Sequence, residues 1–233
     1  MNTDLFKKIG KLLVIGTLGS ALLLGCGGGG GGGAASNNPA FIVAGVTLYA
    51  APISSYVAVV IVETDSTNRI PITTATVTVN GVALALAQNN TIYTSNAVLP
   101  DGSGNFNLTV TANGTTYTAT ESAFTSPPVV TVPAFTASAV NTITWTAPGG
   151  APAPGNGMFY DLLIQHQSTH TSAYALELIT ALSADIPAGT TQTGSGYIAT
   201  VSGIRIGSQI VGAVTGSNLS MSALSQQASY SAL

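Results

Sequence analysis

The chain has very few charged residues and a single cysteine. Only 6% of its 233 residues are charged, whereas ordinary soluble domains carry roughly 25%. Exposed helices usually depend on Glu, Lys and Arg, so their scarcity favours strands and turns. Because Cys26 has no partner for an internal disulfide, any exported domain depends on its hydrophobic core. The hydrophobic share of 45% is ample for such a core.

Positive charge is nearly absent beyond the first 25 residues. Three of the five basic side chains lie within residues 1–11, and only Arg69 and Arg205 come after them. Two cations cannot neutralise a phosphate backbone, which excludes nucleic acid as a partner. Anionic lipid surfaces do not attract such a chain either.

Residues 1–25 have the pattern of an export signal. Residues 1–11 contain three lysines, and residues 12–24 are apolar and uncharged. This apolar stretch is too short to span a bilayer, which takes roughly 20 residues. A charged segment followed by a short apolar segment is typical of a secretory signal peptide.

The next residues, Leu23, Leu24, Gly25 and Cys26, resemble the lipobox of bacterial lipoproteins. Leu24 is larger than the Ala or Ser usual at its position. The resemblance implies cleavage before Cys26, a thioether-linked diacylglycerol on its sulfur and often a third acyl chain on the new amine. Several acyl chains give stable anchoring. The alternatives are an ordinary cleaved signal, with Cys26 a chance residue, or an uncleaved anchor.

A glycine run comes directly after the cysteine. Glycine occupies every position from 27 to 33, and glycine-rich chains behave as flexible coils. We interpret residues 26–39 as the lipidated cysteine and a tether that holds the folded part of the chain about 20 Å from the lipid. In well-studied lipoproteins a residue such as Gly27 after the cysteine implies outer-membrane delivery. Whether the chain faces the periplasm or the cell surface stays open.

From residue 41 onward the sequence predicts short strands. Apolar and polar residues alternate with period two, as in half-buried antiparallel strands. Asn80-Gly81 and Asn113-Gly114 predict two-residue hairpin turns. For residues 172–183 a helix is an alternative, although we favour a strand. The expected strands cover residues 41–49, 56–63, 74–80, 82–87, 91–95, 105–111, 115–121, 129–137, 141–147, 158–165, 172–180, 195–203, 209–216 and a last segment around 219–231.

The expected fold class is all-β, with two tandem antiparallel β-sandwich domains. Two prolines at 127 and 128 mark a boundary between residues 40–126 and residues 127–233. Segments 143–148 and 160–164 resemble two core strands of a fibronectin type III domain, which implies that Trp145 is a core residue. The family's usual Tyr is missing from 209–216. The first region resembles a bacterial immunoglobulin-like module in its TVTVNG and YTATES segments.

His166 and His170 are the two histidines and the candidate metal ligands. On a helix this spacing can chelate zinc, with Asp161 or Glu177 as the nearest third ligand in sequence. The intervening Gln-Ser-Thr is a poor helical segment. We therefore favour two loop histidines near a hairpin tip, and we expect neither a bound metal nor any other cofactor.

Two further acidic patterns have polar, non-catalytic interpretations. Asp101, Ser103 and Asn105 imitate the opening of a calcium loop, but the residues after them lack the Gly and Glu that an EF-hand requires. We interpret them as a hairpin turn. Glu63 and Asp65 lie on one face at a strand end, which indicates a solvated end rather than a carboxylate pair. No G-x-S-x-G nucleophile motif occurs.

The aromatic side chains leave two interpretations open. They could line a carbohydrate-binding face, or they could pack in the cores, which we favour. These residues are Trp145, Tyr49, Tyr56, Tyr93, Tyr117, Tyr160, Tyr174, Tyr197 and Tyr230.

The sequence predicts a membrane-anchored surface lipoprotein that is not an enzyme. It would display β-sandwich modules for binding, adhesion or scaffolding, with a protein or carbohydrate partner at the cell surface. One alternative is an accessory subunit of a cell-envelope or secreted enzyme system that binds a metal or a carbohydrate. Another is a subunit of an extracellular assembly built by strand addition, because the strand edges lack the lysines that normally block pairing.

Overall fold

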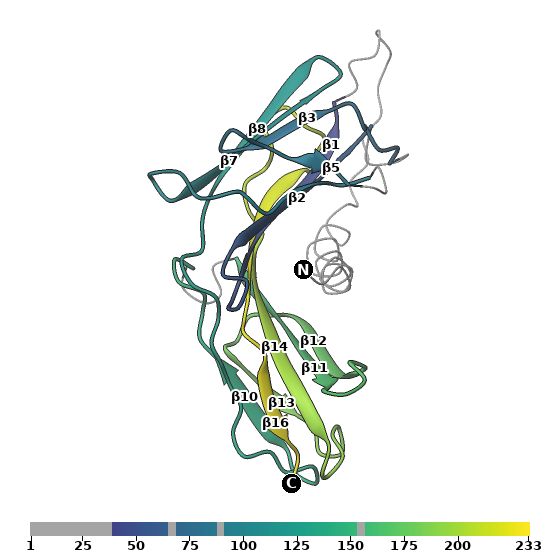
Figure 1. Ribbon diagram of the computed structural model, residues 1–233, viewed down its shortest axis with the longest axis vertical. Coiled ribbons are helices and arrows are strands. Elements are labelled where there is room, and N and C mark those ends of the chain that lie inside the picture. The colour runs from purple at the N-terminus through teal and green to yellow at the C-terminus, as the bar shows by residue number, and fades with distance from the viewer. Residues whose placement is uncertain (1–38, 65–68, 88–90, 153–156) are drawn as a thin grey trace. The chain divides into compact units, whose positions relative to one another are not determined.

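The computed structural model describes residues 39–64, 69–87, 91–152 and 157–233 (Figure 1). These residues form strands and no helix, which confirms the all-β class. Accordingly, the described residues include no helix with the length and apolar character needed to cross a membrane. The strands are β1 (Phe41–Tyr49), β2 (Tyr56–Glu63), β3 (Thr76–Val79), β4 (Val82–Ala83), β5 (Ala85–Leu86), β6 (Tyr93–Ser95), β7 (Asn105–Ala112), β8 (Thr115–Ser122), β9 (Val130–Thr131), β10 (Asn141–Trp145), β11 (Met158–His166), β12 (Ser172–Ile179), β13 (Ser183–Ile186), β14 (Gly196–Arg205), β15 (Asn218–Leu224) and β16 (Ala228–Ser231).

The chain divides into two compact units, and each unit contains segments from distant parts of the sequence. The first unit contains the described residues up to 46, residues 56–123 and residues 206–221. The second unit contains residues 47–55, 124–205 and 222–233. No local residue pattern indicates which distant segments join the same unit, because such patterns carry no information about long-range pairing.

The first unit has two sheets around one core. One sheet has the order β4-β3-β7-β8, and the other includes β2, β6 and β5. The alternating pattern of β7 buries Phe106, Leu108 and Val110, and β2 buries alternate residues in the same way. The rings of Tyr56 on β2 and Phe106 on β7 meet edge to face, with centroids 5.0 Å apart. This arrangement of layers is consistent with a β-sandwich.

Both predicted hairpin turns are confirmed in this unit. Asn80 and Gly81 have φ values of 48° and 77°, and Asn113 and Gly114 have 52° and 78°. Positive φ at both central residues is the type I′ requirement, which Asn and Gly meet at little cost. The second turn joins β7 to β8, which pair over their full lengths.

The second unit also has two groups of strands. β11 pairs with β12 on one side and with β14 on the other, and β16 pairs with β14. A separate three-stranded sheet has the order β13-β10-β9. Its central strand buries Ile143 and Trp145 and exposes Thr142 and Thr144. Residues 172–179 form strand β12, so the strand interpretation is confirmed over the helix.

Three predicted strands differ from the structure. Residues 82–87 form two short strands, β4 and β5, which belong to different sheets. Residues 129–137 contain only the two-residue strand β9. Residues 209–216 form one arm and the turn of a hairpin in the first unit instead of a strand. Gly212 and Gly216 adopt φ values of 80° and 92° there, which bend the backbone out of the extended conformation.

Candidate functional site

The two histidines lie at the turn between β11 and β12. His166 ends β11, and His170 lies in the turn with a φ of 54°. The His170 N–H donates to the carbonyl oxygen of His166 at 2.8 Å, and the His166 N–H donates to the carbonyl of Thr171 at 2.9 Å. The predicted position near a hairpin tip is confirmed for both histidines, although His166 is a strand residue and not the predicted loop residue. The His166 ring also packs on Tyr197, with centroids 4.5 Å apart.

The structure does not bring the expected third ligand to these histidines. Asp161 and His166 are five residues apart on the same strand, so their side chains lie on opposite faces of β11. The Asp161 carboxylate instead accepts a hydrogen bond from the N–H of Leu178 at 2.9 Å. Among the described residues no group of three or more His, Cys, Asp or Glu side chains could hold a metal ion.

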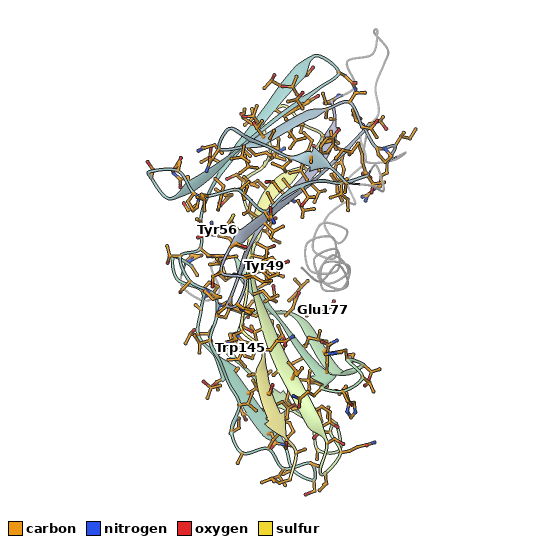
Figure 2. The ribbon with its side chains drawn as sticks, in the orientation of Figure 1. Tyr49, Tyr56, Trp145 and Glu177 are labelled. Atoms are coloured by element: carbon orange, nitrogen blue, oxygen red, sulfur yellow. The ribbon has the colours of Figure 1, made fainter. Side chains whose placement is uncertain are left out.

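Asp161 has a role in the shape of the β11–β12 pair. The register between these strands shifts between Tyr160 and Leu162, and Leu178 has a φ of 54°, as in a β-bulge. Burial raises the pKa of the Asp161 carboxyl, and the nearby charge of Glu177 raises this pKa further, while the bond from Leu178 lowers it. Figure 2 labels Glu177 on β12. Asp161 therefore stabilises the bulged backbone through its hydrogen bond to Leu178.

Asp101 lies in a polar turn, as predicted, but this turn is not a hairpin, because the strands that it joins, β6 and β7, belong to different sheets. One carboxylate oxygen accepts from the N–H groups of Ser103 and Asn105, each at 2.9 Å, and the other accepts from the Asn107 amide at 2.7 Å. These three bonds lower the pKa of the Asp101 carboxyl. The bonds from Ser103 and Asn105 are the arrangement of an Asx turn, and the bond from Asn107 ties the turn to β7.

The acidic pattern of Glu63 and Asp65 lies only partly within the described residues. Glu63 ends β2 and forms an isolated bridge with Pro71. Asp65 lies outside the described residues, as does the lipidation candidate Cys26. The interpretation of each of these two residues stays a prediction.

Most of the aromatic side chains belong to the cores. Trp145 is 4% exposed, and Tyr117, Tyr160 and Tyr197 are at most 2% exposed. Trp145 packs against Tyr160 with ring centroids 5.9 Å apart. Figure 2 labels Trp145, Tyr49 and Tyr56, of which the first two are buried and Tyr56 is half-buried. The core interpretation is confirmed for these residues, and they do not form an exposed stacking platform.

Three strands of the first unit expose a continuous uncharged polar surface, which we call the polar face. It is formed by the side chains of β3, β7 and β8 that point away from the core. These side chains are Thr76, Thr78, Asn105, Asn107, Thr109, Thr111, Thr116, Thr118, Thr120 and Ser122. The sequence indicated the alternation within each strand, but only the register shows that the three strands share this face.

The register arranges the polar face in rows that cross the sheet. Thr76, Thr111 and Thr116 form one row, and Thr78, Thr109 and Thr118 form the next. Neighbouring strands lie about 4.8 Å apart, and alternate residues along a strand lie about 6.8 Å apart. Several side chains are fixed by cross-strand hydrogen bonds, including Thr120 to Asn107 at 2.9 Å and Ser122 to Asn105 at 3.1 Å.

The sequence contains no signal for the contact between Ser208 and Glu121 in the first unit. Ser208 donates hydrogen bonds from its backbone N–H and its hydroxyl to the carboxylate of Glu121 on β8. Its hydroxyl also lies 3.1 Å from the carbonyl oxygen of Thr120. No local motif signals a contact between residues 87 positions apart.

Comparison with known proteins gives no family for this chain, because no protein-family model and no curated protein matches it.

Proposed function

We propose that the chain is a bacterial lipoprotein that displays non-catalytic β-sandwich modules at the cell envelope. Its modules would be of the immunoglobulin-like and fibronectin type III-like kinds, and its role would be binding, adhesion or scaffolding. The observation that carries the anchoring is the sequence Leu23-Leu24-Gly25-Cys26, followed by the glycine run. The acyl chains on Cys26 would hold the chain in the membrane through burial of about 0.8 kcal/mol per CH₂ group.

The polar face supports binding as the role of the first unit. Its ten outward side chains are hydroxyls and amides without a formal charge. A negatively charged ligand docked there would lose its hydration without gaining an ion pair, and the Asp101 carboxylate beside Asn107 would repel it. The face therefore suits an uncharged, hydroxyl-bearing partner such as a neutral polysaccharide. A single hydrogen bond contributes only about 0.5–1.5 kcal/mol. A polymer that contacts several rows at once therefore fits best.

Detergent partition of the full-length chain tests the anchoring. The chain expressed in a bacterial host should enter the detergent phase of a phase-separating detergent, because its acyl chains are apolar. The Cys26→Ser variant should move to the aqueous phase, since it removes the acylated sulfur. Partition of both chains into the aqueous phase would contradict the proposal.

Adhesion of cells that carry the full-length chain tests the polar face. We expect retention on a dextran-coated surface that persists at high salt, because no charge is screened. Thr109→Lys with Thr118→Lys, a cross-strand pair on the polar face, should reduce retention several-fold. The matched control is Thr131→Lys with Thr144→Lys, an exposed cross-strand pair of the second unit. Equal retention of both double variants would contradict a role for this face.

A further inference from the structure

Two asparagine–glycine pairs of the first unit lie in the same kind of turn. Asn80-Gly81 joins β3 to β4, and Asn113-Gly114 joins β7 to β8. The φ values of the two asparagines are 48° and 52°, and those of the two glycines are 77° and 78°. A third such pair, at 156 and 157, has its asparagine outside the described residues. The first two pairs therefore place the same dipeptide on the same backbone in two different surroundings.

The two glycines are alike in their accessibility. Gly81 and Gly114 are exposed, and a Cβ at either position would meet no atom within 4 Å. Neither glycine N–H donates a backbone hydrogen bond within the described part of the chain. Because glycine has no Cβ, its own N–H can be approached closely by the side chain of the preceding residue. Any difference between the two turns must therefore come from the asparagines.

The side chain of Asn80 is held by four hydrogen bonds. Its Nδ2 donates to the carbonyl oxygens of Leu99 at 2.7 Å and Asn105 at 2.9 Å. Its Oδ1 accepts from the backbone N–H of Asn107 at 2.8 Å and from the side-chain amide of Asn107 at 3.0 Å. The Asn80 amide group is thus fixed against β7 and the loop that precedes it.

The side chain of Asn113 has none of these restraints. It is exposed and makes no hydrogen bond with the described residues. Its turn is closed by the strand pair of Ala112 and Thr115, the last pair of the β7–β8 ladder. The ends of such ladders open locally at a small cost in free energy. The Asn113 side chain can therefore rotate toward the nitrogen of Gly114.

We propose that Asn113 is a site of spontaneous deamidation and that the fold protects Asn80 from the same reaction. The backbone nitrogen of Gly114 attacks Cγ of Asn113. The N–Cγ bond forms, the Cγ–Nδ2 bond breaks, and ammonia leaves with the proton that the Gly114 nitrogen gives up. Water then opens the resulting cyclic imide at either carbonyl, which leaves an aspartate or an isoaspartate at position 113.

The hydrogen bonds of Asn80 oppose this reaction at Gly81. Attack on its Cγ requires the Asn80 side chain to turn away from Leu99, Asn105 and Asn107, and all four bonds are lost in that step. Each bond contributes a modest net free energy, and their sum lowers the population of the reactive conformation. We therefore expect Asn80 to lose its amide at least about tenfold more slowly than Asn113 in the folded chain.

The product changes the end of the polar face that lies next to the turn. Thr111 and Thr116 form the strand pair adjacent to Ala112 and Thr115, and they belong to the polar face. An acid at 113 places a negative charge beside this row, whose own side chains carry none. Isoaspartate also lengthens the backbone of the two-residue turn, which its type I′ geometry does not accommodate. Deamidation thus alters both the charge and the geometry of this hairpin tip.

Incubation of the folded full-length chain at mildly alkaline pH tests the proposal. Samples are taken at intervals and digested with chymotrypsin, which cuts after aromatic residues and leucine and so places Asn80 and Asn113 in separate peptides. Mass spectrometry measures the conversion of amide to acid in each peptide, and fragment ions assign the acid to its residue. We expect conversion at Asn113 to be at least about tenfold faster than at Asn80. Equal rates at the two residues would overturn the proposal.

The same incubation in concentrated urea separates the effect of the fold from that of the local sequence. Because unfolding removes the hydrogen bonds of Asn80, its rate should rise to that of Asn113. A difference that persists unchanged in urea would overturn the protection by the fold.

The matched variant is Asn113→Gln, since the longer glutamine side chain closes the corresponding imide far more slowly. Conversion at position 113 should fall to the level of the sample taken at the start of the incubation, while Asn80 keeps its rate. Conversion at 113 at the parental rate would overturn the assigned reaction.

Discussion

The carboxylate of Glu121 accepts hydrogen bonds from both the backbone N–H and the hydroxyl of Ser208, which lies 87 residues further along the chain. Gly207 precedes Ser208 in the same tight contact. A Cβ atom at Gly207 would collide with the carbonyl oxygen of Leu219 and would lie 2.7 Å from the Glu121 carboxylate. The backbone at Gly207 therefore fits closely between Leu219 on β15 and Glu121 on β8.

Replacement of Gly207 by alanine should destabilise the chain. The added methyl group must displace backbone, which typically costs about 1–3 kcal/mol and occasionally more. Denaturant unfolding monitored by circular dichroism measures this change. The matched control is Gly102→Ala, since a Cβ there meets no atom within 4 Å. A free energy of unfolding equal for both variants would show that the Gly207 contact is not formed.

Two buried tyrosines should respond differently to loss of the hydroxyl. The Tyr117 hydroxyl accepts a buried hydrogen bond from the N–H of Ala40 at 3.0 Å, so Tyr117→Phe leaves that donor unsatisfied, at a cost of about 1–3 kcal/mol. The Tyr160 hydroxyl is buried and has no hydrogen-bond partner among the described residues. Tyr160→Phe should therefore be neutral or stabilising. Thermal unfolding of both variants gives the comparison, and equal losses would refute it.

The stability of the chain should depend on the ionisation of Asp161. Its pKa is raised above the ordinary 3.8, chiefly by burial. A raised folded-state pKa means that stability is fully present below the unfolded-state value and is lost as the pH rises through the folded-state value. Asp161→Asn keeps an acceptor for Leu178 and cannot ionise. It should be more stable than the parent chain at pH 7, and this advantage should vanish below the ordinary pKa of 3.8. Denaturant unfolding at a series of pH values measures the difference in free energy of unfolding between the two chains. A difference that does not change with pH would contradict the assignment.

Metal removal should leave the folded state unchanged. His166 and Asp161 lie on opposite faces of β11, so a shared ion cannot contact both. We expect the melting temperature to be the same in EDTA and in excess zinc. Binding to the folded state would raise stability by RT ln(1 + [L]/Kd). A zinc-dependent rise that the double variant His166→Ala, His170→Ala abolishes would therefore restore the metal hypothesis.

The sequence predicted the features that depend on local pattern. Alternation in residues 106–110 and the Asn-Gly pairs predicted β7, β8 and the turn between them, because burial and positive φ act within a few residues. The core positions of Trp145 and Tyr160 were predicted from the general tendency of aromatic side chains to pack in cores, and the resemblance to a fibronectin type III domain implied the same for Trp145.

The features that the sequence did not predict depend on long-range pairing. Residues 209–216 are apolar enough for a strand, yet Gly212 and Gly216 turn the chain back in a hairpin that lies on β8. The rows of the polar face likewise depend on the register between β3, β7 and β8. The residues of a strand specify neither its partner strand nor its register. The grouping of distant segments in one unit and the Glu121–Ser208 contact are therefore seen only in the structure.

The lipid-modified N-terminus at Cys26 is central to the proposed function, and mass spectrometry of the N-terminal peptide tests it most directly. The full-length chain is expressed in a bacterial host, and its membrane fraction is digested. We expect a peptide that begins at Cys26 and carries the mass of a diacylglyceryl group, alone or with a third acyl chain. A peptide that begins at another residue, or an unmodified Cys26, would contradict the lipoprotein proposal.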